Sequence, residues 1–316
     1  MSRTSDDLLQ ELRFALAEAD STPPSDDARR RVLDHALANR AAGRSARVPP
    51  EIGGDEAFSR SVAQMDELLG DLEVSDWGRM ALRGLSVQGL IGHLIGVERA
   101  FIEVLRGHPD ATPPGGHVGT TQPTAEAQSD RLPEETLRDW RTTTGTTLAL
   151  LRAEPGQDPR LPTRIAFYGI ELPLQQLLVV RAFEMWIHHE DIRRATGRGP
   201  SSPDEATLSK MTELAVTLLP AALELAGAVR AQESAAVHLV LTGPGGGTWD
   251  VPANGAMSQR AGEGGLRRAA SVVVDAADFC RVVGNRSNLA TSGARIGAGE
   301  PMVAELFAAA AGLALD

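Results

Sequence analysis

The stretch Arg181-Ala-Phe-Glu184-Met-Trp-Ile-His188-His-Glu-Asp191 decides the fold of this chain. At about 100° per residue, its four numbered residues fall in one row along a helix. Apolar side chains flank that row on both sides, and the opposite side of the helix is polar. A polar row inside an apolar stripe faces the protein interior, where a charged group must be paired or bound to a metal. The stretch therefore predicts a buried polar cluster on a helix of a bundle.

Two interpretations of this row stay open on the residues alone. In the first, Glu184 and His188 are four residues apart, so a carboxylate and an imidazole converge on one metal ion. In the second, Arg181 pairs with Glu184 and His188 pairs with Asp191, which gives a buried salt-bridge network without a metal. A third ligand from another part of the chain favours the first interpretation.

His93 is the candidate for that third ligand, in the stretch Ser86-Val-Gln-Gly-Leu-Ile-Gly-His93. Ser86 is a good N-cap for the helix that follows, and His93 borders the apolar face of this helix. Gly89, Gly92 and Gly96 are poor helix formers, so their presence predicts the close approach of another backbone. The alternative for a lone histidine is a core or boundary position with one hydrogen bond.

Together these motifs resemble the mycothiol-dependent maleylpyruvate isomerase family, within the DinB-like thiol S-transferase superfamily. The resemblance is carried by Trp77, by the helix with His93, and by the later series Arg181, Glu184, His188 and Asp191. It extends well over about residues 55–198 and more loosely beyond them. It implies a four-helix bundle that holds a divalent metal, expected to be zinc, on His93, Glu184 and His188. It also implies mycothiol, a low-molecular-weight thiol, as the co-substrate.

Asp191 and Arg286 are the two further candidate site residues. Asp191 can accept a hydrogen bond from the outer nitrogen of a metal-bound histidine, as carboxylates often do beside metal sites; the alternative is a salt bridge to Arg194 or Arg181. Arg286 stands where the resemblance implies an arginine that reaches the active-site cleft and binds a substrate carboxylate, a task that suits a planar guanidinium. The alternative for Arg286 is a solvated surface position.

Composition restricts the partners and the compartment. The 316 residues carry a formal net charge of −11, with a sequence pI near 5.2, which excludes a general surface for nucleic acid or for an anionic membrane. The single cysteine, Cys280, excludes an internal disulfide and is expected to be a packed core thiol rather than a nucleophile. We expect a cytoplasmic protein without a secretory signal or a membrane-spanning helix.

The expected fold class is α+β, in three parts. Residues 1–50 form a helical extension with a linker; we expect it to pack on its own bundle, and the alternative is a contact with a second chain in a homodimer. Residues 51–230 form the DinB-like metal-binding bundle, with a long loop at 108–124. Residues 231–316 form a small α/β domain on an antiparallel sheet, which resembles the sterol-carrier-like C-terminal domain of the family. The helices are expected at 6–19, 26–39, 55–72, 86–106, 134–151, 173–196 and 203–226.

The expected function is that of a metal-dependent S-transferase or isomerase that uses a thiol of the mycothiol type on a small electrophile, including carboxylate-bearing ones. Three protein ligands leave one metal position open for the thiol. One alternative is a non-catalytic protein that senses metal or thiol on the same fold. A second alternative is a hydrolase that uses metal-bound water.

Overall fold

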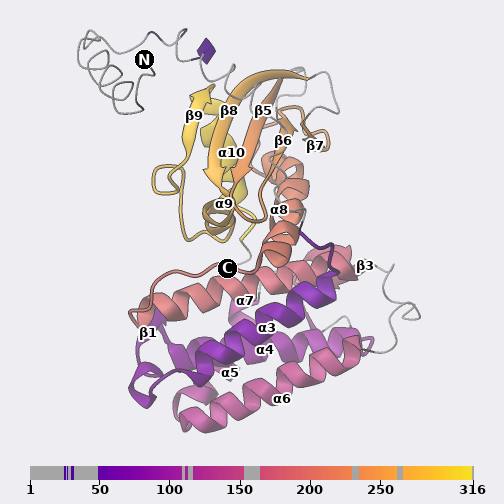
Figure 1. Cartoon of the computed structure of the whole chain (residues 1–316). Coiled ribbons are helices and arrows are strands. Elements are labelled where there is room, and N and C mark those ends of the chain that lie inside the picture. The colour runs from indigo at the N-terminus through magenta and orange to yellow at the C-terminus, as the bar shows by residue number, and fades with distance from the viewer. Residues whose placement is uncertain are drawn as a thin grey trace, which may run out of the picture. The chain divides into compact units, whose positions relative to one another are not determined.

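The computed structural model describes residues 25, 27, 30–31, 49–108, 111–112, 117–152, 164–229, 235–261 and 266–314. Backbone contacts divide the chain into Met1–Ala46 and Arg47–Asp316. Everything below concerns the second unit, which contains both the helical part and the α/β part (Figure 1). Of the two helices predicted for the N-terminal extension, 6–19 lies outside the described residues, and the described residues of 26–39, which are Asp27, Arg30 and Arg31, are helical. The domain boundary near residue 230 stays a prediction.

The helical part follows the predicted segments closely. Its long helices are α3 (Gly54–Gly70), α4 (Val87–Leu105), α6 (Pro133–Leu151), α7 (Leu174–Ala195) and α8 (Glu205–Leu225). Helix α3 packs against α7 and α6, and α4 packs against α6 and α7, so these four helices surround a common core (Figure 1). Short elements connect them: η1 (Val74–Asp76) and the strand pairs β1 (Met80–Leu82) with β2 (Leu85–Ser86), and β3 (Arg164–Phe167) with β4 (Ile170–Pro173).

Helix α5 (Val118–Ser129) corrects the sequence prediction, which placed a loop at 108–124. The segment has few apolar residues and contains Pro123 inside the helix, so neither its pattern nor its propensity indicated a helix. It packs along α4 instead. Tertiary packing of this kind supplies most of the stability of a helix with a weak pattern.

The contact between α4 and α5 depends on glycines. A Cβ atom at Gly92 would lie 2.8 Å from the Cα atom of Ala125, and one at Gly96 would lie 3.1 Å from the Thr121 side chain. These two positions confirm the expected close approach of another backbone, because a larger residue leaves no room for α5. The close packing brings Thr121 beside His93.

We expect the same substitution to have opposite effects at two helical glycines. Gly92→Ala should destabilise the protein by about 1–3 kcal/mol, because its Cβ atom meets backbone rather than a flexible side chain. Gly145→Ala in α6 is the matched control; its Cβ atom meets nothing within 4 Å, so it should stabilise by up to about 1 kcal/mol. Urea unfolding of both variants tests this, and equal effects would contradict the proposed contact.

The α/β part contains one five-stranded sheet in the order β7-β6-β5-β8-β9. Its elements are β5 (Ala235–Thr242), β6 (Gly247–Pro252), β7 (Gln259–Arg260), β8 (Arg267–Asp275), α9 (Ala276–Val283), β9 (Arg295–Ala298) and α10 (Glu300–Ala311). Strands β5 and β6 form an antiparallel hairpin, and the Asp275 side chain accepts hydrogen bonds at the N-cap of α9. The sheet was predicted to be antiparallel; its β5–β6, β6–β7 and β8–β9 pairings are, whereas β8 pairs with β5 in parallel. The chain continues from β6 to β7 on one side and then crosses to the far side of β5.

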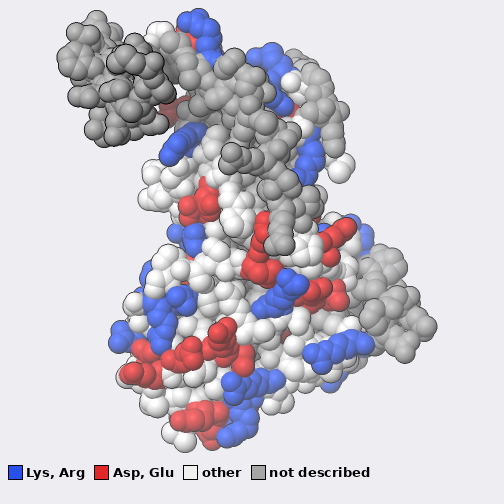
Figure 2. All heavy atoms as spheres, in the orientation of Figure 1, with Lys and Arg blue, Asp and Glu red and all other residues white. Residues whose placement is uncertain are grey.

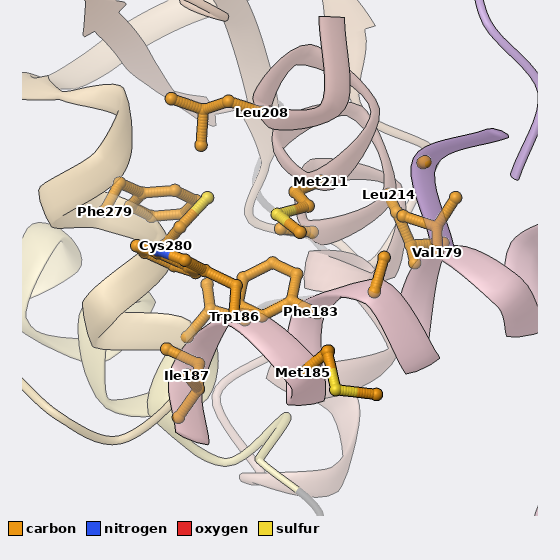
Figure 3. Close-up of a cluster of buried hydrophobic side chains, with 14 of the residues drawn as sticks. Val179, Phe183, Met185, Trp186, Ile187, Leu208, Met211, Leu214, Phe279 and Cys280 are labelled. Carbon is orange, nitrogen blue, oxygen red and sulfur yellow. The ribbon is translucent and has the colours of Figure 1, made fainter. Parts of the chain in front are cut away.

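The helical and α/β parts share a packed interface where α7, α8 and α9 meet. Figure 3 shows Trp186 and Ile187 of α7 facing Phe279 and Cys280 of α9, with Met211 of α8 beside them. Cys280 is fully buried, which confirms its assignment as a core thiol. This interface places the end of α9 over the polar row of α7.

The surface shows no concentration of one charge on the face drawn in Figure 2, where acidic and basic side chains are interspersed over the helices. Arg60, for example, pairs with Glu56 and Asp204, and Arg141 pairs with Asp66. None of the helices in the described part of the chain combines the length and the apolar character that crossing a bilayer requires.

Candidate functional site

Helix α7 carries the polar row into the interior, as the sequence predicted. Arg181 and Asp191 are 0% exposed and His188 is 2% exposed, although all three are polar. The Glu184 side chain retains 14% exposure. Since ionised groups this deeply buried need partners, the partners of each member define what the row can do.

The two oxygens of Glu184 have different surroundings. Oε2 accepts a hydrogen bond from Arg181, whose other terminal nitrogen donates to Glu98, and Glu98 accepts a second bond from Thr147 at 2.8 Å. Oε1 is buried and accepts no hydrogen bond within the described residues. It lies 3.7 Å from Nε2 of His93 and 3.5 Å from Nε2 of His117. One oxygen therefore holds the carboxylate in place, and the other faces two imidazoles.

Hydrogen bonding orients the ring of His93. Its Nδ1 atom lies 2.7 Å from the hydroxyl oxygen of Thr121, and that hydroxyl donates to the carbonyl oxygen of His117 at 2.9 Å. Since the single hydroxyl proton of Thr121 is used there, the hydroxyl accepts from His93 Nδ1–H. The lone pair of neutral His93 is then on Nε2, the atom that faces Glu184, as a metal ligand requires.

The ring of His188 is oriented in the same way by Asp191. Nδ1 of His188 donates to Oδ2 of Asp191 at 3.1 Å. Burial raises the pKa of Asp191, but hydrogen bonds from His188 and Arg286 outweigh that effect and lower the pKa to about 2. The ionised carboxylate can only accept hydrogen bonds, so the free lone pair of His188 lies on Nε2.

His117 is the site residue that the sequence interpretation missed. It precedes α5 directly, is 2% exposed, and forms with His93 and Glu184 a group whose ligand atoms all lie within 4.8 Å of one another. His117 has no partner pattern in the sequence and was therefore assigned no role. The one available signal was the glycine face of α4, which predicted that some backbone would approach His93.

The predicted metal ligands are only partly brought together. His93 and Glu184 lie in the group with His117, whereas His188 lies just outside it, with its ring centroid 5.6 Å from that of His93. His188 lines the same cavity as His117 and Glu184. The assignment of His188 as a ligand therefore stays a prediction.

The donor set fits a divalent metal. Donor atoms bound to one tetrahedral zinc at about 2.1 Å lie about 3.4 Å from one another. The separations of 3.5 and 3.7 Å around Glu184 Oε1 are close to this value and longer than ordinary hydrogen bonds. A buried carboxylate oxygen that accepts no hydrogen bond within the described residues is one that a cation would stabilise.

Arg286 lies beside the site but not in its cavity. Its guanidinium binds Asp191 with two nitrogens, at 2.8 to 3.2 Å, and its side chain is 8% exposed. It is absent from the described residues that line the cavity, whereas its neighbour Gly284 is among them. The surface alternative for Arg286 does not match this burial, and its contact with a substrate carboxylate stays a prediction.

The cavity is lined by residues of both the helical part and the α/β part. His117, Glu184 and His188 form its polar side, and α8, the end of α9 and the C-terminal residues Leu313 and Ala314 contribute apolar walls. The cavity volume that a water-sized molecule can reach is about 80 Å³, and the cavity opens to solvent.

Comparison with known proteins agrees with this architecture. Residues 58–193 match the family described as the mycothiol maleylpyruvate isomerase N-terminal domain. Two solved structures have a similar fold, the mycothiol-dependent maleylpyruvate isomerase and a histidine-to-alanine mutant of it. Each is 13% identical to this chain with a TM-score of 0.51, and each match covers 75% of this chain and 90% of the other. Among proteins of curated function, none matches.

These matches confirm the predicted α+β fold, a DinB-like helical part followed by an α/β part. The family match covers α4 and most of α7, and therefore includes His93, Glu184 and His188. Over residues 58–193, this chain is similar to the family of the mycothiol maleylpyruvate isomerase N-terminal domain.

Proposed function

We propose that this protein is a metal-dependent isomerase or S-transferase that activates a low-molecular-weight thiol of the mycothiol type. The observation that carries the proposal is Glu184 Oε1, which is buried beside two imidazoles at the wall of a cavity. The family match over residues 58–193 and the names of the two similar structures support the choice of thiol.

In this proposal His93, Glu184 and His188 hold a divalent metal, with zinc as the expected ion. A metal bound there supplies the positive charge that favours the thiolate form of the thiol. Thr121 and Asp191 hold the two histidines through Nδ1, and Arg286 acts through Asp191 as a positioning residue. Conjugate addition then forms a carbon–sulfur bond while the alkene π pair moves to the activating carbonyl, and the proton lost by the thiol returns to carbon. An isomerase reverses these steps after bond rotation, and a transferase releases the adduct.

Turnover of a conjugated enone by the metal-loaded protein tests the proposal, with mycothiol, with glutathione and without thiol. We expect catalysis above the uncatalysed rate only with a thiol, and only while metal is bound. No catalysis with any thiol, despite stoichiometric metal, would favour the sensing alternative. Hydrolysis of an ester without thiol would favour the hydrolase alternative.

Cys280 should not replace the added thiol. Burial raises the pKa of Cys280 far above its usual range, so its reactive thiolate is scarce at neutral pH. We expect Cys280→Ser to retain thiol-dependent turnover within about threefold, since the change affects only packing away from the cavity lining. Loss of activity in this variant, together with wild-type turnover in the absence of thiol, would identify Cys280 as the nucleophile.

A further inference from the structure

The walls of the cavity indicate which electrophile it accepts. Beyond its polar side, the lining is formed by Val180, Phe183 and Ile187 of α7, Leu214 and Leu218 of α8, and Leu313 near the C-terminus. Figure 3 shows Phe183, Ile187 and Leu214 within the apolar cluster between α7 and α8. No lysine or arginine is among the described residues that line the cavity. Apart from the histidines, Glu184 and the opening to solvent, a ligand in this space therefore meets mainly hydrocarbon among the described residues.

The two arginines nearest the cavity already have carboxylate partners. Arg181 is 0% exposed and bonds both Glu98 and Glu184. Arg286 gives three hydrogen bonds to Asp191. To bind a substrate carboxylate, Arg181 would have to leave the buried Glu98 without its cation, which costs about 3–5 kcal/mol. Arg286 would have to give up its three hydrogen bonds to Asp191, which Arg194 also contacts at 2.5 Å.

The charges at the site are already paired with one another among the described residues. A divalent metal, the Glu184 carboxylate and one thiolate sum to zero. Arg181 is balanced by Glu98, and Asp191 is shared by Arg286 and Arg194, whose side chain is 58% exposed. A carboxylate that entered the apolar cavity would lose its hydration without gaining a cation, so it would bind poorly or take up a proton.

We infer that the cavity selects an uncharged, apolar electrophile and discriminates against carboxylate-bearing ones. The inference rests on the proposed function for its chemistry, because the electrophile reacts with the activated thiol. It restricts the substrate class more narrowly than the sequence did, which admitted both neutral and acidic substrates. The selectivity lies in the walls contributed by α7, α8 and the C-terminal residues.

A matched pair of enones tests this selectivity on the full-length, metal-loaded protein with mycothiol. Benzylideneacetone is neutral, and its para-carboxylate differs by one charge placed far from the reacting carbon. After each uncatalysed rate is subtracted, we expect kcat/KM to favour the neutral enone by at least about tenfold, within the range of hydrophobic-pocket discrimination. Equal or better use of the carboxylate would overturn the inference.

Leu218 offers a variant that tests the walls directly. It lies partly buried on α8 at the cavity, away from the candidate ligands. Leu218→Arg introduces a cation into the wall and should reduce or invert the preference for the neutral enone, whereas Leu218→Met, the control for size, should retain it. An unchanged preference in Leu218→Arg would show that the selectivity arises elsewhere and would overturn the inference.

Direct binding separates this inference from the proposed function. Calorimetry with benzylacetone and its para-carboxylate, which are saturated and unreactive, requires neither thiol nor turnover. If neither enone is turned over but benzylacetone binds at least about tenfold more tightly than its para-carboxylate, the proposed function fails and the inferred selectivity of the cavity stands. If the two ketones bind equally, or if neither binds, the inference fails whatever the activity.

Discussion

Glu184→Gln should abolish metal binding while it preserves the fold. The substitution keeps the shape of the side chain and removes the charge that faces His93 and His117 at 3.7 and 3.5 Å. Zinc bound by four protein ligands contributes about 10–16 kcal/mol, so one ligand accounts for roughly 3 kcal/mol and at least about a hundredfold in affinity. We expect one divalent metal per wild-type chain by elemental analysis after purification without added metal, and none in the variant.

His93→Ala should have the same effect, and an exposed histidine provides the control. His108 pairs with Glu103 at the surface, with its side chain 66% exposed, so His108→Ala should retain the metal. Circular dichroism and unfolding midpoints confirm that each variant is folded. Stoichiometric metal in both Glu184→Gln and His93→Ala would refute the assignment of the site.

Two further variants decide the third ligand. We propose His188 in this role, because Asp191 orients its ring and it lines the cavity. In that case His188→Ala loses the metal and His117→Ala keeps it. The opposite result would make His117 the third ligand, since its Nε2 atom lies 3.5 Å from Oε1 of Glu184. Cobalt substitution supplies a spectroscopic readout of ligand number in each variant that does not depend on activity.

The two interpretations that the α7 sequence left open turn out to be compatible. Each of the predicted salt bridges is present, Arg181 with Glu184 and His188 with Asp191. They use Oε2 of Glu184 and Nδ1 of His188, and these contacts leave Oε1 and Nε2 for a metal. Carboxylates and imidazoles have two ligand atoms each, so pairing on one side positions the other. The helical period predicts which residues share the row. Only the structure shows which atoms of each side chain form the salt bridges and which remain for a metal.

The features that the sequence could not predict are contacts between residues far apart in the chain. Several of them involve a segment with a weak hydrophobic pattern. α4 has a strong apolar face and α7 is rich in apolar residues along its length, and their predicted bounds are close to the observed ones. α5 has almost no such face, and its helix depends on packing against glycines of α4. The sequence therefore did not indicate that His117 and Thr121 are neighbours of His93. The bond between Arg286 and Asp191 also joins residues far apart in sequence and was not predicted.

Arg181→Met should be among the most destabilising single changes in the chain. Arg181 is 0% exposed and links Glu98 and Glu184, and Glu98 is also 0% exposed. Among the described residues, its removal leaves the Glu98 carboxylate with only the 2.8 Å bond from Thr147. A buried charge without its ionic partner destabilises by about 3–5 kcal/mol. Urea unfolding in the presence of a chelator measures this loss without a contribution from bound metal.

An exposed arginine and a double substitution show whether the loss arises from buried charge. Arg141 pairs with Asp66 at 2.7 Å, but its side chain is 53% exposed, so Arg141→Met should cost less than about 1 kcal/mol. Glu98→Leu combined with Arg181→Met removes both buried charges and should recover most of the stability, because apolar side chains of similar size can replace a buried ion pair. The double variant should still bind metal more weakly, since Arg181 no longer holds Oε2 of Glu184. Equal losses in Arg181→Met and Arg141→Met, or no recovery in the double variant, would show that Arg181 contributes by packing rather than by neutralising Glu98.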